Sequence, residues 1–129
     1  MNIKPITNYF TDDRPLLFKS KLKKLYKKGK LPIKYGLYGE ELTKKNVTDE
    51  HLLPRCLGGS NDLSNIALAT KEANWRRGSE PIDFFLSIGM LRNYCKQFKG
   101  IKLREFDGDE YVKSIIKTIK GLVENDSIL

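Results

Sequence analysis

The feature that most constrains the fold is a loop rich in turn residues between two short strand candidates. This loop, residues 52–64, holds Pro54, the pair Gly58-Gly59 and a polar cluster. Short runs of strand-forming residues flank it, and a short helical pattern follows the second run and stops at a glycine. These local signals predict a hairpin followed directly by a helix. The expected elements are strands at about residues 46–51 and 66–70 and a helix at residues 71–77.

The rest of the chain supplies helices that can cover such a hairpin. Residues 12–29 show apolar side chains at helical spacing and end at a glycine, and residues 33–42 resemble a knuckle with glycines at its bends. Residues 79–125 contain two longer helical patterns, the second with a continuous apolar face. A chain of 129 residues has the length of one domain. We therefore expect a single α+β domain over residues 1–129, with C-terminal helices at about 81–98, capped by Ser79, and about 109–123.

The distribution of charge favours a polyanionic partner. The formal net charge is +8, and residues 1–78 hold 16 basic and 8 acidic side chains, whereas residues 79–129 hold 8 of each. A cationic domain of this size suits nucleic acid, and DNA is the partner we expect, with RNA left open. A run of lysines on the predicted N-terminal helix either contacts phosphates or only solvates an exposed face. The lysines expected to contact phosphates are Lys23, Lys24, Lys27 and Lys28.

Other sequence features limit where the chain works. No stretch approaches the roughly 20 apolar residues of a membrane span, and the first residues lack the apolar middle of a signal peptide. Cys56 and Cys95 do not form a CxxC pair, which argues against a disulfide framework. We therefore expect a cytoplasmic protein that does not enter a membrane.

The residues that could perform chemistry gather in the predicted hairpin and helix. His51 is the only histidine of the chain, and it ends the first strand candidate directly after Asp49 and Glu50. A lone histidine is more often structural than catalytic, but polar residues follow it in a definite order. That order is Asn65 before the second strand, Asn74 in the helix, and Arg76-Arg77-Gly78 at the end of the helix.

This series resembles the HNH endonuclease family over about residues 35–78. The resemblance implies a ββα-metal core in which Glu50 and Asn74 hold a metal ion. It also implies that His51 is the general base and that Asn65 orients the loop and His51. The third motif position is Asn rather than His, so the chain is similar to the HNN variant of the family.

The sequence lacks the zinc-binding cysteines that many members of this family carry. Where those members have CxxCG and CxxCN, this sequence has YGLYG at residues 35–39 and TKEAN at residues 70–74. We therefore expect no structural zinc, and we expect Tyr35 and Tyr38 to serve in packing rather than function.

The expected chemistry follows from the residue types. Hydrolysis of a phosphodiester needs an activated water and a cation on the anionic oxygens. A neutral imidazole with a pKa of about 6.5 can accept the proton of that water. One carboxylate and one carboxamide oxygen form a hard ligand set, which favours Mg²⁺ or Mn²⁺, placed to stabilise the leaving group.

Two assignments depend on local geometry. In a regular strand His51 shares a face with Asp49 and not with Glu50. The resemblance places the carboxylate directly before the histidine, at a strand end where the chain can bend, so Glu50 is expected as the ligand and Asp49 is the runner-up. Arg77 follows Asn74 by one helical turn, which favours a role beside the phosphate. The arginines expected to contact nucleic acid are Arg55, Arg76 and Arg77.

The sequence therefore predicts a small ββα-metal core with a basic N-terminal helix and two C-terminal helices. The expected activity is metal-dependent endonuclease on DNA, leaving 5′-phosphate and 3′-hydroxyl ends. So short a chain resembles stand-alone nucleases of phages and other mobile elements. Two other readings stay open: an HNH-fold nucleic-acid-binding or inhibitor protein with little or no activity, and a basic protein whose lysine helix does the binding.

Overall fold

The computed structural model describes the backbone of residues 14–123 and the side chains of residues 21–123. Within these residues the fold is α+β, with four helices and two antiparallel strand pairs. No described helix is long and apolar enough to cross a membrane. The helices are α2 (Arg14–Lys27), α3 (Lys71–Arg77), α4 (Ile88–Lys96) and α5 (Gly108–Leu122), and the strands are β1 (Val47–His51), β2 (Ile66–Thr70), β3 (Lys102–Leu103) and β4 (Phe106–Asp107).

The predicted hairpin and helix are confirmed. β1 pairs with β2 in an antiparallel register that runs from Val47 opposite Thr70 to His51 opposite Ile66. The chain passes from β2 directly into α3, because the Thr70 side chain accepts a hydrogen bond from the backbone N–H of Ala73 and so caps the helix. Gly78 ends α3 with a positive φ of 57°.

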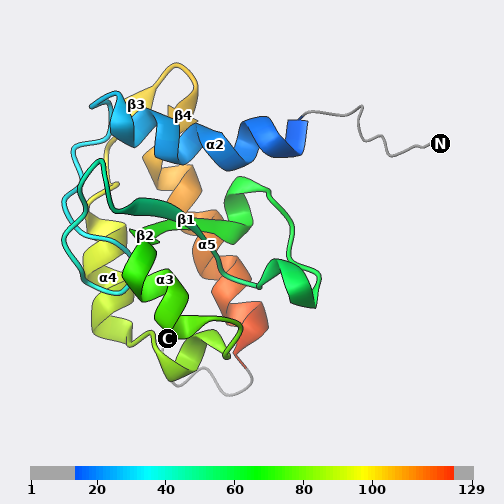
Figure 1. Ribbon diagram of the computed structural model, residues 1–129. Coiled ribbons are helices and arrows are strands. Elements are labelled where there is room, and N and C mark those ends of the chain that lie inside the picture. Colours follow the sequence, from blue (N-terminus) through cyan, green and yellow to red (C-terminus); the bar gives the residue numbers. More distant parts are fainter. Residues whose placement is uncertain (1–13, 124–129) are drawn as a thin grey trace.

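The basic N-terminal helix is also confirmed. α2 packs on the β1–β2 hairpin through buried Leu22 and Leu25, and Gly29, with φ of 76°, ends the helical segment. In Figure 1, α2 crosses above the hairpin and α3 lies below it. Phe18, one of the apolar residues at helical spacing in residues 12–29, lies outside the described side chains. We call Lys23, Lys24, Lys27 and Lys28 the lysine face; Lys23 is half-buried and the other three are exposed.

The expected knuckle is present between α2 and β1. Tyr35 and Glu41 form an isolated antiparallel bridge, and the backbone N–H of Gly36 donates to Glu40. Gly39 has a φ of 90°, which favours glycine at this bend. The knuckle places Tyr38 directly against the hairpin.

Two tyrosines support the outer edge of β2. The hydroxyl of Tyr111 donates to the carbonyl of Ile66 at 2.7 Å, and the hydroxyl of Tyr94 accepts from the backbone N–H of Leu68 at 3.0 Å. Both rings are buried beside Phe98. A two-stranded sheet leaves backbone groups unpaired at its edges, so these hydroxyl groups complete the hydrogen bonding of a strand that is buried throughout.

The predicted helix at residues 81–98 is wrong in its first part. Residues 82–84 form a 3₁₀ turn, and α4 begins only at Ile88. The Ser87 side chain accepts from the backbone N–H of Met90, so the helix is capped there and not at Ser79. The last helix agrees with the expectation for residues 109–123, and Asp107 caps it by accepting from the N–H of Glu110.

Candidate functional site

His51 lies at the end of β1 and is partly exposed to solvent. Its Nε2 atom is 2.9 Å from Oδ1 of Asn61, a residue of the loop between the strands. The donor and acceptor roles in this contact depend on the tautomer of the ring. In the tautomer protonated on Nε2, the ring donates to this oxygen and Nδ1 carries the lone pair of the neutral imidazole.

The loop that presents Asn61 is closed by a buried asparagine. Asn65 accepts from the backbone N–H of Leu53 at 2.8 Å and donates to the carbonyls of Leu53 and Ser60. A side chain at Gly59 would collide with the Leu53 carbonyl, because an added Cβ would lie only 1.7 Å from its oxygen. Asn65 and the glycine therefore fix the path of the loop, which agrees with the loop-orienting role expected of Asn65.

Asn74 connects α3 to β1. Its side-chain nitrogen donates to the backbone carbonyl of Asp49 at 2.9 Å, and the residue is partly exposed. This contact leaves the carboxamide oxygen of Asn74 on the other side of the amide group, which is the atom that a hard cation would use.

Glu50 lies in a buried cluster with Tyr38 and Arg77. The Tyr38 hydroxyl donates to its Oε2 atom at 2.5 Å, and Nη1 of Arg77 donates to the same oxygen at 3.2 Å. Burial raises the pKa of Glu50, whereas the hydrogen bond from Tyr38 and the charge of Arg77 oppose the increase. Burial and the neighbouring carboxylate also raise the pKa of Tyr38, so its hydroxyl stays protonated and donates.

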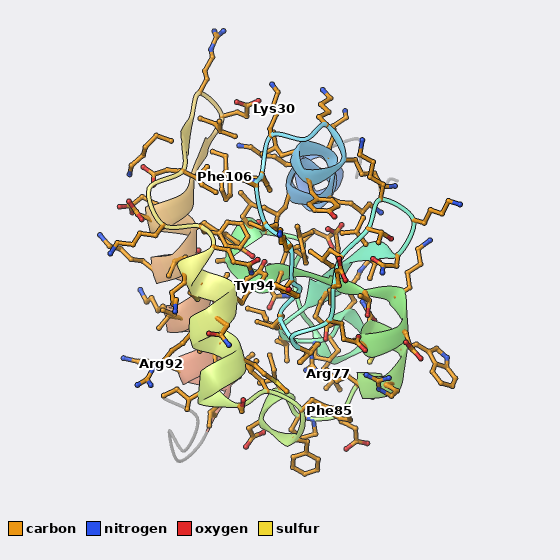
Figure 2. All side chains as sticks on the ribbon, turned by 90° about the vertical axis from the view of Figure 1, so that its left-hand side faces the viewer. Lys30, Arg77, Phe85, Arg92, Tyr94 and Phe106 are labelled. Atoms are coloured by element: carbon orange, nitrogen blue, oxygen red, sulfur yellow. The ribbon has the colours of Figure 1, made fainter. Side chains whose placement is uncertain are left out.

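Arg77 was expected beside a phosphate, and the structure corrects this expectation. Its exposed fraction is only 2%, and every nitrogen of its guanidinium donates within the protein. Figure 2 shows Arg77 in the interior, while Arg92 extends outward from α4. The acceptors are the Glu80 carbonyl for Nε, the Leu52 carbonyl for Nη2, and the His51 carbonyl and Glu50 for Nη1.

The other expected nucleic-acid contacts are accessible, but one of them has protein partners. Arg55 is exposed in the loop after β1. Arg76 is half-exposed and forms ion pairs with Glu40 at 3.1 Å and Glu72 at 3.8 Å. Exposed pairs of this kind are weak, so Arg76 can still exchange its partners for a phosphate.

The expected metal ligands do not form an open site in this arrangement. Glu50 is 3% exposed, and its Oε2 atom is held by two donors, one of them a cation. β1 stays in regular register through His51, so the expected bend beside Glu50 is absent and His51 shares a face with Asp49. Asp49, the runner-up, is 6% exposed. A metal at Glu50 would require Arg77 to withdraw, and the described residues contain no group of three or more His, Cys, Asp or Glu side chains placed to bind a metal.

Two residues of this site were not identified from the sequence. Tyr38, expected only in packing, contacts Glu50, and its position at the second missing cysteine was the available signal. Asn61 contacts His51, but nothing in the polar loop distinguishes it from its neighbours before the fold is known.

A separate groove of about 840 Å³ lies between α4 and α5. Leu91, Val112 and Ile116 are among its apolar residues, and Arg92 and Lys113 are among its basic ones. Part of the apolar face expected of the last helix, represented by Val112 and Ile116, therefore lines a surface groove. None of the residues expected to perform chemistry lines this groove.

Comparison with known proteins gives no further information on the site, since no protein family, curated protein or solved structure matched the chain.

Proposed function

We propose that the protein is an endonuclease that hydrolyses DNA phosphodiester bonds with His51 as the general base. The position of His51 carries this proposal, because the chain's one imidazole lies at a partly exposed strand end and is held there by Asn61 of the adjoining loop. The HNH resemblance of residues 35–78 and the observed hairpin-helix arrangement support it.

The proposed reaction balances without any other group from the chain. Nδ1 of His51 accepts a proton from water, and the resulting hydroxide attacks the phosphorus atom. The bond between phosphorus and the 3′ oxygen breaks, and that oxygen takes a proton from solvent. The products are a 5′-phosphate and a 3′-hydroxyl. The resemblance implies that Mg²⁺ or Mn²⁺ assists, but we assign no step to a metal because Arg77 holds Glu50.

One observation favours a second candidate function, a nucleic-acid-binding protein that does not cleave. The ion pair between Glu50 and Arg77 is buried on both sides, and it removes the carboxylate expected to hold the metal from solvent. If that pair persists when nucleic acid binds, the chain keeps the hairpin-helix arrangement without the metal chemistry.

A nicking assay on supercoiled plasmid tests both candidates. The wild type, His51→Ala and the control Asn93→Ala, an exposed residue of α4, are compared with Mg²⁺, Mn²⁺ or EDTA. Loss of a general base should lower the cleavage rate by about 10²–10⁴-fold in His51→Ala only. Cleavage by His51→Ala at the wild-type rate would refute the mechanism. Binding of the plasmid without cleavage by any of the three proteins would establish the second candidate.

A further inference from the structure

Trp75 is the only tryptophan of the chain, and its exposed fraction is 82%. Tryptophan is usually largely buried, because its ring is the largest apolar surface among the side chains. α3 buries Ala73 and Arg77, which are one turn apart, against the hairpin. Trp75 lies between them in sequence and therefore projects from the opposite side of the helix.

The position of Trp75 relates it to the candidate site. It directly follows Asn74, whose side chain is tied to β1 two residues before His51. α3 has only two turns, so the indole is fixed to the same short rigid element that contacts the strand bearing the proposed base. Lys71 lies one turn before Trp75 on the same face and is exposed.

We propose that Trp75 stacks on an unpaired base of the bound strand, so that the preferred substrate is single-stranded or locally opened DNA. This inference rests on the proposed function, since it needs nucleic acid at the hairpin and α3. An exposed indole face offers the stacking surface that single-strand-binding proteins use. In an intact duplex both faces of a base are covered by its neighbours, so stacking there would require unstacking a base step.

The surface around Trp75 offers little positive charge to a phosphate, so stacking and phosphate binding can be measured separately. Glu72 and Glu80 are exposed on and just after α3, and Arg76 is paired with carboxylates. This surface is therefore not strongly cationic, and the attraction for phosphate must come mainly from elsewhere, such as the lysine face. Loss of Trp75 should lower affinity without changing the slope of log affinity against log salt, because stacking releases no counterion.

The sole tryptophan gives a direct measurement of stacking. The wild type is titrated in EDTA, without cleavage, with three oligonucleotides of equal length: a single strand, a matched single strand with abasic sites throughout, and a duplex. We expect indole fluorescence to be quenched strongly by the single strand and little by the other two. The abasic strand has the same phosphates without bases, so it controls for charge.

Variants then connect the signal to affinity. Trp75→Ala should bind the single strand about 5- to 150-fold more weakly, a range that follows from measured base-aromatic stacking, while its affinity for the abasic strand should not change. Trp75→Phe should recover part of the loss. Phe84→Ala is the matched control, because Phe84 is 70% exposed and should leave all affinities unchanged.

The outcomes distinguish this inference from the proposed function. Equal affinity of Trp75→Ala and wild type for the single strand, without quenching, would overturn the stacking inference even if the protein cleaves DNA. Quenching together with the affinity loss would support stacking even if the wild type binds DNA without cleaving it. Burial of Trp75 in a dimer of this chain, seen as a change of indole emission with protein concentration, would also overturn the inference.

Discussion

Arg77→Met should destabilise the protein strongly, because it leaves a buried carboxylate without its cation. Removing one partner of a buried ion pair costs about 3–5 kcal/mol. Arg77 also donates to three backbone carbonyls, at 2.8 Å to Glu80 and 2.9 Å to both His51 and Leu52, so we expect a loss near 5 kcal/mol. For a domain of this size, a loss of that order lowers Tm by roughly 15–30 °C.

The loss should also depend on pH. Burial already raises the pKa of Glu50 in the wild type, and Arg77 opposes this increase. Without Arg77 the folded-state pKa rises further above the unfolded value, so the folded variant binds its proton more tightly than the unfolded chain. The stability of the variant is then greatest below the unfolded pKa and falls as pH increases toward the folded pKa. The cost of Arg77→Met should therefore be full at about pH 8 and smaller near pH 4, where mainly the loss of the three backbone hydrogen bonds remains.

Chemical denaturation of three variants at both pH values measures these effects. Arg76→Met is the matched control on the same helix, and its exposed ion pairs predict a loss under about 1 kcal/mol. The double variant Glu50→Gln/Arg77→Met should recover part of the stability at pH 8, because no buried charge remains. A loss below about 1 kcal/mol for Arg77→Met, or a loss that is equal at both pH values, would refute an ionised buried pair.

Three further predictions concern the site and the lysine face. Asn61→Asp should raise the pKa of His51, because it places a negative charge beside Nε2. The acidic limb of the pH profile of the cleavage rate should then move to higher pH, and an unmoved limb would remove Asn61 from the proposed mechanism. Mn²⁺ titrated calorimetrically without DNA should bind weakly, because Arg77 holds Glu50, and tight binding abolished by Glu50→Gln would show that the metal displaces Arg77. Replacing the lysine face with Gln should make the salt dependence of DNA binding shallower by about 0.9 per lost phosphate contact, whereas an unchanged slope would mean that these lysines only solvate the helix.

The hairpin and α3 could be predicted because their signals are local. The loop after β1 requires a glycine at Gly59, because a side chain there would meet the Leu53 carbonyl. Thr70 caps the start of α3, and Gly78 ends it. Such signals act within a few residues of chain and do not depend on distant contacts. Asn65 could be recognised for the same reason, since it closes the loop that precedes it.

The contacts made by Arg77 could not be predicted in this way. A position one turn after Asn74 is compatible with either a phosphate or a buried carboxylate, and only the packing of α3 on β1 decides between them. The start of α4 was missed for a different reason. Residues 81–98 have a continuous helical pattern, but Ser87 lies inside it and caps a helix that begins at Ile88.

His51, the proposed base, is more accessible to solvent than the two candidate carboxylates, Asp49 and Glu50, which precede it in the regular strand β1. Asp49 lies opposite Leu68 and Glu50 opposite Ala67, so their side chains point to opposite faces of the hairpin. The face of Glu50 is closed by Arg77. Burial raises the pKa of Tyr94, and the charge of Asp49 raises it further, which places Asp49 near the face that α4 and α5 cover. Of these three side chains only His51 is partly exposed. Solvent therefore reaches part of His51 in the hairpin as it stands, whereas any role for either carboxylate in binding a metal requires a rearrangement.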